Sequence, residues 1–476
     1  MTNGSLSTFS IPSQTVCLLP EPRPKLKRAV ASWALYDFAN SSFTTVIVTF
    51  VYSVFFSKAM TGDEITGQAM WAHGVTMSAI GIAILSPVLG AIADRGGYRK
   101  RFLFVFTLMA IVGSIMLFFA EPYSARADAG LESQAGTAIL WFILANVGFE
   151  LGGVFYNAFL PDLAPQHRIG RISGYGWALG YLGGLLCLVI ALFGFIQTDT
   201  PWFGFTTEAN ENVRATCLLV AAWFAVFSIP IFLFVEEDRS AASPPTASLV
   251  QETWRQLKAT ALEIRSYRHV VRLLIARLFY NDGLVTIFAF GGIYAGTVFD
   301  FTLDEVIVFG IALNVAAGAG AWAFSFIDDK IGGKRTIDWT LVGLLAAVVI
   351  AVLAPSRFWL WVGGLAVGIF AGPNQAASRS LLGRFVPPDK ENEFFGFFAF
   401  SGKATAFLGP LLLGQATLLF HSQRAGVATV LIFLSIGYGL LQLVDEKEGV
   451  RLAGRSIAET DCLQVQRSRH GNQHLV

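Results

Sequence analysis

The chain has 476 residues, of which 54% are hydrophobic and only 14% are charged, and its formal net charge is +1. A soluble protein of this length would carry about a quarter charged residues, so the composition excludes an ordinary soluble enzyme or binding domain. No basic stripe interleaved with aromatic residues is present, and nucleic acid is therefore not an expected partner. The four cysteines are too far apart to form a zinc or redox motif, so we predict no metal site and no cofactor. These cysteines are Cys17, Cys187, Cys217 and Cys462.

Long apolar blocks, separated by short charged stretches, recur along the chain. A helix of about 20 apolar residues crosses the ~30 Å hydrocarbon layer of a bilayer. The blocks have this length, so we predict an all-α integral membrane protein with twelve transmembrane helices in two pseudo-symmetric six-helix bundles. The predicted spans are 30–57, 67–93, 102–120, 137–160, 172–196, 214–235, 271–299, 304–327, 336–354, 357–382, 394–420 and 425–444.

These spans divide the chain into five predicted parts. A disordered cytoplasmic tail (1–28) precedes the N-terminal bundle (29–235), and a linker (236–270) leads to the C-terminal bundle (271–444) and a final tail (445–476). The linker carries apolar residues at helical spacing from Trp254 to Ile264, which predicts an amphipathic helix on the membrane surface. Lys and Arg are concentrated in alternate loops, and the positive-inside rule then places both termini in the cytoplasm.

A short loop motif occurs once in each half of the chain. The segment from Asp94 to Lys100 and the segment from Asp329 to Arg335 share the pattern acidic, basic, any, Gly, any, basic, basic. A second correspondence joins the fifth and eleventh spans, where Pro165 precedes Gly174 and Pro387 precedes Gly396 by the same spacing. Repeated halves with a site at their interface are common among secondary transporters.

We expect these two loops to form a cytoplasmic gate. The glycine permits a tight turn, and the acid can cap a helix N-terminus or pair with a base of the other half in one conformation only. The alternative is a topology signal combined with a glycine turn. The candidate gate residues are Gly90, Asp94, Arg95, Gly97, Arg99, Lys100, Asp162, Asp329, Lys330, Gly332, Lys334, Arg335 and Arg379.

Several of these segments resemble a known family. The loop that begins at Gly90 is similar to the signature of the major facilitator superfamily, with Tyr98 at a place where many members have a base. The resemblance spans about residues 29 to 445 and implies a rocker-type transporter with alternating access. Its vacuole-effluxer-like branch includes eukaryotic members associated with amino-acid efflux from the vacuole. The segments that resemble this branch are Trp33–Ser41, Pro161–Leu163, Gly174–Gly184, Tyr280–Gly283, Phe394–Gly396 and Ser401–Pro410.

Ionisable residues within the predicted spans are candidate pathway residues. A charge at membrane depth costs about 2.5–3.5 kcal/mol on insertion scales, so each such residue requires a reason. Asp37 and Arg277 occupy corresponding spans of the two halves, and we expect them to pair across the pathway; a purely structural ion pair is the alternative. Carboxylates at Asp37, Glu150 or Asp282 would allow proton coupling. The candidate pathway residues are Asp37, Asn40, Asn146, Glu150, Asn157, Arg277, Tyr280, Asn281, Asp282, Asn374, Gln375 and Lys403.

The predicted function is secondary active transport of a small polar metabolite, with amino acids first and proton-coupled efflux as the mode. The alternatives are another small solute, such as a sugar, organic acid, drug or lipid, and a membrane sensor or scaffold. An enzyme is not expected, because the sequence has no clustered nucleophile, metal ligands or soluble catalytic domain. The expected partners are the substrate, the lipid bilayer and protons, and we expect a functional monomer. The predicted location of the protein is the cell membrane, which is the inner membrane if the source is bacterial.

Overall fold

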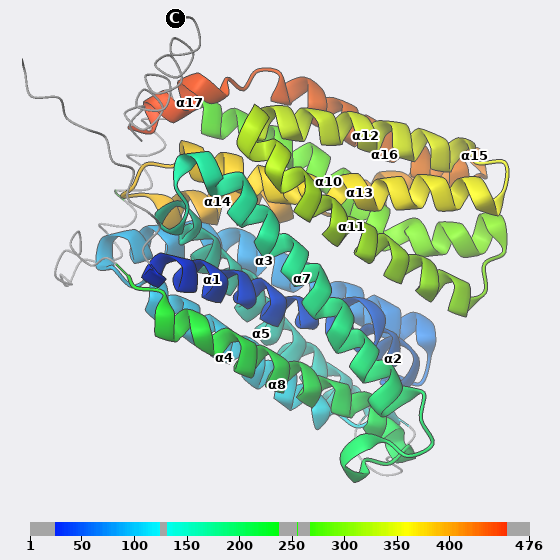
Figure 1. Cartoon of the computed structure of the whole chain (residues 1–476). Helices are drawn as coiled ribbons and strands as arrows, with labels where there is room; N and C mark the ends of the chain where they lie inside the picture. The colour runs from blue at the N-terminus through cyan, green and yellow to red at the C-terminus, as the bar shows by residue number, and fades with distance from the viewer. Residues whose placement is uncertain (1–23, 124–130, 238–254, 256–266, 455–476) are drawn as a thin grey trace, which may run out of the picture.

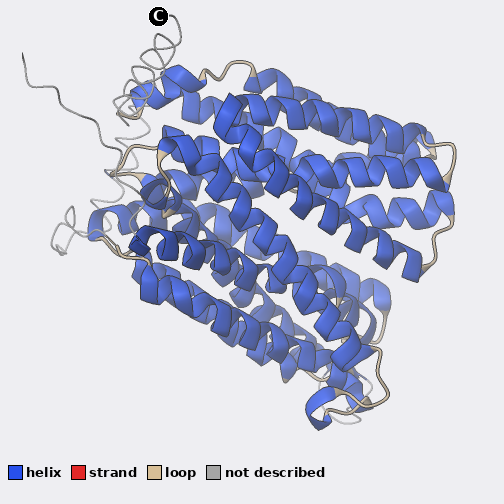
Figure 2. Cartoon of the chain, viewed as in Figure 1, coloured by secondary structure: helices blue, strands red, loops and turns tan. Residues whose placement is uncertain are grey.

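The computed structural model describes residues 24–123, 131–237, 255 and 267–454, and in this part of the chain it shows helices and loops but no strand (Figure 2). The first half of the chain gives α1 (Pro24–Ser42), the π-helical segment η1 (Phe43–Phe50), α2 (Tyr52–Ala59), α3 (Glu64–Gly96), α4 (Arg99–Phe118), α5 (Leu131–Ala158), α6 (Leu160–Leu163), α7 (Ile169–Ala191) and α8 (Glu211–Phe234). The second half gives α10 (Arg268–Phe299), α11 (Leu303–Ile331), α12 (Gly333–Leu353), α13 (Arg357–Phe385), α14 (Glu391–Lys403), α15 (Leu408–Phe420), α16 (Gln423–Leu441) and α17 (Glu446–Leu452).

The ends of the bundles differ slightly from the predicted tails. Residues 24–28, which the sequence analysis assigned to the first tail, begin α1, and the final tail contains the short helix α17. The predicted amphipathic helix of the linker lies outside the described residues, apart from Arg255.

Eleven helical segments of the described chain are long and apolar enough to cross a membrane. The long helix α13 is not among them, although it packs beside α11 and α12 like the others. Its second half carries polar side chains, including Asn374, Gln375, Arg379 and Arg384, and most of that half is buried inside the protein. The helix therefore faces protein and the interface between the halves, where an apolar surface is not needed.

The two bundles lie close together at one end and diverge toward the other (Figure 1). The close end is the one at which α1 begins and α8 ends, and there α3 packs against α14 and α7 against α11. We call it the closed end and the opposite one the open end. These contacts join the first half of the chain to the second, so they hold the two bundles together at the closed end.

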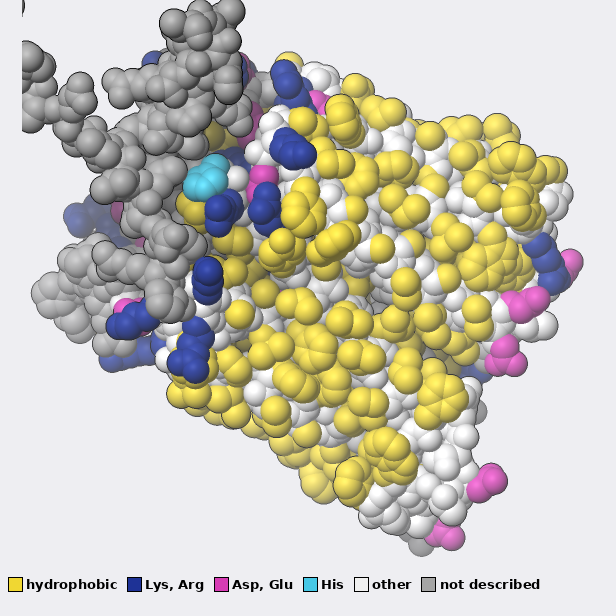
Figure 3. All heavy atoms as spheres, in the orientation of Figure 1, with side chains coloured by type: hydrophobic (Ala, Val, Ile, Leu, Met, Phe, Trp, Pro, Cys, Tyr) yellow, Lys and Arg dark blue, Asp and Glu magenta, His cyan; other side chains and the backbone are white. Residues whose placement is uncertain are grey.

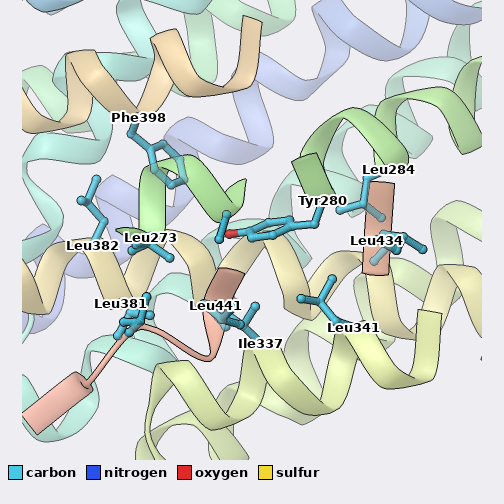
Figure 4. Close-up of a cluster of buried hydrophobic side chains, with 14 of the residues drawn as sticks. Leu273, Tyr280, Leu284, Ile337, Leu341, Leu381, Leu382, Phe398, Leu434 and Leu441 are labelled. Atoms are coloured by element: carbon cyan, nitrogen blue, oxygen red, sulfur yellow. The ribbon is translucent and has the colours of Figure 1, made fainter. Parts of the chain in front are cut away.

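Each bundle has its own apolar core. In the second half, Tyr280 lies among leucines and isoleucines of α10, α12, α13 and α16, such as Leu341 and Leu381 (Figure 4). In the first half, the core is richer in aromatic rings, and Trp33 stacks on Tyr156 with ring centroids 4.7 Å apart. Burial of these rings fixes the rotation of α1 and α5.

Close approach of α1 and α7 depends on small residues. A Cβ atom at Gly183 would overlap the Phe38 carbonyl of α1. We expect Gly183→Ala to force the helices apart and destabilise the protein by about 1–3 kcal/mol, the usual cost of overpacking. Thermal unfolding in detergent measures this, with Gly414→Ala as control, because a Cβ there meets open space. Equal decreases of the unfolding temperature in both variants would contradict the packing argument.

Candidate functional site

A central cavity of about 510 Å³ lies between the two bundles. It continues into a second space of about 330 Å³, because both are lined by Ser41, Trp177 and Tyr181. The second space reaches Phe50 and Val306, toward the open end. Five helices, α1, α5, α10, α13 and α14, contribute the ionisable and amide side chains that line the larger cavity. The polar residues that line the larger cavity and that the sequence analysis named are Asp37, Asn40, Glu150, Asn157, Arg277, Asn281, Gln375, Arg379 and Lys403.

Arg379 forms the floor of the cavity at the closed end. Its Nη1 donates to Asp37 Oδ2 at 2.9 Å and to Asn157 Oδ1 at 3.1 Å, and its Nη2 donates to the Ser173 carbonyl at 2.6 Å. The guanidinium also lies 4.8 Å from the ring centre of Trp33. One side chain of α13 thus holds α1, α5 and α7 of the other half. The planar fork of arginine suits this arrangement, because it donates in several fixed directions at once.

A second ion pair joins the halves on the cavity wall. Lys403 Nζ of α14 lies 2.6 Å from Glu150 Oε1 of α5, and both side chains remain about a quarter exposed to the cavity. Lys403 is the last residue of α14, and the chain is not helical again until α15 begins at Leu408. The pair is therefore close to a break in its own helix and reachable by a solute.

The predicted pair of Asp37 with Arg277 was wrong. Arg277 instead donates through Nη1 to the Phe398 carbonyl at 2.8 Å and to Ser401 Oγ at 2.9 Å, and its guanidinium stacks 3.6 Å from the Phe398 ring centre. These partners belong to α14 of the same half, which holds Arg277 on its own side of the cavity. Arg379 reaches Asp37 from α13 instead.

Four predicted pathway residues do not line the cavity. Asn146 donates to Ser78 Oγ at 2.7 Å, and Asn374 donates to Thr340 Oγ1 at 3.0 Å, each inside its own bundle. The Tyr280 hydroxyl shares a hydrogen bond with Ser378 Oγ at 2.8 Å within the apolar core, as its position among leucines shows (Figure 4).

The fourth of these residues, Asp282, is also buried. Its Oδ2 accepts from the Gly409 N–H at 3.1 Å, in the first turn of α15. All four residues thus point into their own bundle, a direction that span depth alone does not reveal.

The acid of the first loop motif caps a helix of the other half. Asp94 accepts from the backbone N–H of Asn392 at 3.0 Å and of Glu393 at 2.7 Å, in the first turn of α14. Beside it, Arg99 pairs with Glu391 of the same turn at 3.2 Å and also with Asp162. A carboxylate at a helix N-terminus accepts hydrogen bonds from free N–H groups and interacts favourably with the positive end of the helix dipole.

The second loop motif makes the symmetry-related contact. Asp329 Oδ1 accepts from the Arg171 N–H of α7 at 3.0 Å, and its Oδ2 lies 3.2 Å from Arg171 Nε. Arg171 and Glu393 are separated along the chain by the same number of residues as Gly174 and Gly396, which the sequence repeat had matched. Each half thus caps the fifth or eleventh span of the other.

The remaining candidate gate residues are three glycines and five basic residues. Gly97 and Gly332 have φ of 60° and 93°, so both positions favour glycine. A Cβ at Gly90 would overlap the Asn392 carbonyl of the other half. Lys100 Nζ donates to the Val235 carbonyl at 2.7 Å, and Lys334 pairs with Asp338 at 2.9 Å; both contacts stay within one half. Arg335 is exposed, Lys330 is the penultimate residue of α11, and Arg95 lies in the last turn of α3.

Sequence reasoning missed one ion-pair network and one aromatic wall. Arg384 of α13 lies 2.7 Å from Asp328 of α11, next to the repeated motif but outside its pattern. Trp177 and Tyr181 line both parts of the central space from α7. Their spacing of one helical turn would have placed them on one face, with Gly180 between them.

Comparison with known proteins gives matches over nearly the whole chain. The model of the family described as "Vacuole effluxer Atg22 like" matches residues 59–454. The "Uncharacterized MFS-type transporter YxiO" of Bacillus subtilis (strain 168) is 27% identical over 419 residues, which are 87% of this chain and 94% of that protein. "Autophagy-related protein 22-1" of Penicillium rubens is 23% identical over 84% of this chain and 79% of that protein.

Solved structures give the fold. The proton:xylose symporter XylE superposes with a TM-score of 0.66 at 14% identity, over 88% of this chain and 95% of the symporter. The transporter FucP in the outward conformation has a TM-score of 0.69 at 10% identity, over 89% of this chain and 99% of FucP. Both are described as major facilitator superfamily proteins, so the predicted all-α fold is confirmed.

Proposed function

The chain belongs to the Atg22-like vacuole effluxer family of major facilitator transporters, and from this premise we propose that it carries zwitterionic metabolites, amino acids first, by alternating access. The family resemblance that the sequence predicted is thereby confirmed. The chain is an MFS-type transporter, a class that is typically not enzymatic. Its substrate, direction and coupling belong to the proposal.

The observation that carries the proposal is the Glu150–Lys403 pair on the cavity wall. An amino acid brings one ammonium and one carboxylate. It can therefore insert between Glu150 and Lys403 and give each a new partner of opposite charge. A neutral sugar cannot do so, because opening the pair would leave two poorly compensated charges in a partly desolvated site. The amide groups of Asn281 and Gln375, which face the same cavity, add neutral hydrogen-bonding partners.

We propose that the closed end is cytoplasmic and that both termini lie on that side, in a cell membrane. The excess of Lys and Arg in the loops at this end supports the orientation. The conformation would then face outward. Contacts of Asp94, Arg99, Asp329 and Arg379 join the two halves at this end, so they would have to break before the cavity opens to the cytoplasm. Asp37 and Glu150 are the cavity carboxylates that we propose for proton coupling.

Counterflow of a radiolabelled amino-acid panel into proteoliposomes tests the proposal. We expect selective exchange by the wild-type protein and a loss of at least about tenfold in Lys403→Gln, because Glu150 then lacks its cation and the substrate carboxylate lacks a partner. The control is Asp199→Asn, which alters an exposed residue of a loop. Absence of exchange for every amino acid, with folded protein confirmed by gel filtration, would contradict the substrate assignment.

A further inference from the structure

A second hollow lies on the outer surface of the protein, apart from the central cavity. It has a volume of about 640 Å³ and is bounded by α1, by the turn before α7, by α7 itself and by Trp322 of α11. None of its lining residues lines the central cavity. Most of its wall is apolar, with Leu26, Val30, Leu179 and Leu182 among the contributors. We call it the α1–α7 groove.

The closed end of the α1–α7 groove is basic. Lys27, Arg168 and Arg171 line it there, and Lys27 and Arg168 are exposed. In the part of the chain that the structure describes, neither Lys27 nor Arg168 has a side-chain hydrogen bond or an ion pair. Arg171 contacts Asp329 through its Nε and retains 36% side-chain exposure. Among the described residues, therefore, no carboxylate pairs with Lys27 or Arg168, and both present positive charge at this end of the groove.

The dimensions of the α1–α7 groove match one leaflet of a bilayer. Along α7, the distance from Arg168 to Leu182 is about 21 Å at 1.5 Å per residue. Half of the hydrocarbon layer is about 15 Å thick, and the head groups add several ångströms beyond it. The basic end thus lies at head-group depth and Leu182 near the middle of the membrane. On the face that shows α1, α7 and α11, most Lys and Arg side chains lie toward the closed end and hydrophobic side chains cover the middle, while the charged side chains at the open-end margin are mostly acidic (Figure 3).

We propose that the α1–α7 groove binds one anionic phospholipid of the cytoplasmic leaflet. Its phosphate is held by Lys27, Arg168 and Arg171, and one acyl chain lies along α7 beside Trp322. The leaflet assignment depends on the orientation proposed above. Basic pockets between helices at the cytoplasmic surface suit anionic head groups, and arginine offers paired donors to phosphate. A zwitterionic lipid carries its own ammonium, so it gains less from the three cations.

Native mass spectrometry of the purified full chain, titrated with dioleoyl-phosphatidylglycerol or dioleoyl-phosphatidylcholine, tests this site. We expect the wild-type protein to bind the first phosphatidylglycerol more tightly than the first phosphatidylcholine. The double variant Lys27→Gln/Arg168→Gln should lower the affinity for the first phosphatidylglycerol by about tenfold or more, since each basic residue near a lipid surface raises the affinity for an anionic lipid severalfold. Its phosphatidylcholine affinity should stay unchanged.

The matched control is Arg101→Gln/Arg335→Gln, which removes the same charge from two exposed positions at the same end, outside the groove. An equal loss of phosphatidylglycerol affinity in both double variants would show that the lipid is attracted by the overall positive charge of this end and not by the groove, and it would overturn the proposal. Ala31→Trp fills the groove from an exposed lining position without altering charge, and it should weaken phosphatidylglycerol binding as well. Unchanged binding in this variant would place the lipid elsewhere. The readout is lipid retention, so the result is independent of whether the amino-acid assignment holds.

Discussion

Arg379→Gln is expected to abolish transport and to lower stability. The guanidinium is buried and contacts Asp37, Asn157 and Ser173 of the opposite bundle, so its loss leaves the Asp37 carboxylate without a cation. Removing one partner of a buried ion pair typically costs about 3–5 kcal/mol. Counterflow in proteoliposomes and thermal unfolding in detergent measure the two effects separately. Arg379→Lys should also transport poorly, because an ammonium cannot donate along the same fork to three helices.

The double variant Asp37→Asn/Arg379→Gln separates stability from mechanism. It removes both charges together, so no buried charge remains unpaired, and we expect most of the lost thermal stability to return. Transport should remain absent, because one of the contacts that join the two halves at the closed end is still missing. If the double variant regained transport along with stability, the pair would be structural only, and Arg379 would have no part in the conformational cycle.

The sequence was most informative where a local pattern determines a local structure. Apolar block length predicted the spans, and the duplicated motif predicted that Asp94 would cap a helix or pair with the other half, which is the contact seen at α14. The positions of Gly97 and Gly332 followed from the same motif. The span predicted at 357–382 corresponds to α13, although that helix is surrounded by protein and retains Arg379 and Arg384 in its buried half.

Pairing across the two bundles could not be deduced from the sequence. Asp37 and Arg277 have corresponding depths in corresponding spans, yet depth does not fix the direction in which a side chain points. Arg277 is turned toward α14 and stacks on Phe398. Glu150 and Lys403 were both named as candidates, but their contact depends on how α5 meets α14 in space. Rotation of each helix is set by packing, and the packing partners are distant in sequence.

Gly90→Ala is expected to shift the protein away from the conformation described here. A Cβ at Gly90 would overlap the Asn392 carbonyl, and Gly90 and Asn392 belong to opposite halves. The clash therefore exists only while the closed end is shut, and it should not affect a conformation in which α3 and α14 have separated. An overpacking cost of about 1–3 kcal/mol corresponds to about a 5- to 150-fold change in the equilibrium between conformations.

Labelling of a single cysteine at Thr49 by a membrane-impermeant maleimide reports this equilibrium, in a variant whose native cysteines are replaced. Thr49 is exposed in the open-end part of the cavity, so labelling should slow when Gly90→Ala favours the opposite conformation. Gly81→Ala on the same helix is the matched control, because the nearest atom to its Cβ is Val147 Cγ2 at 3.9 Å. If both alanine variants were labelled at the wild-type rate, contact at Gly90 would not control which end is open.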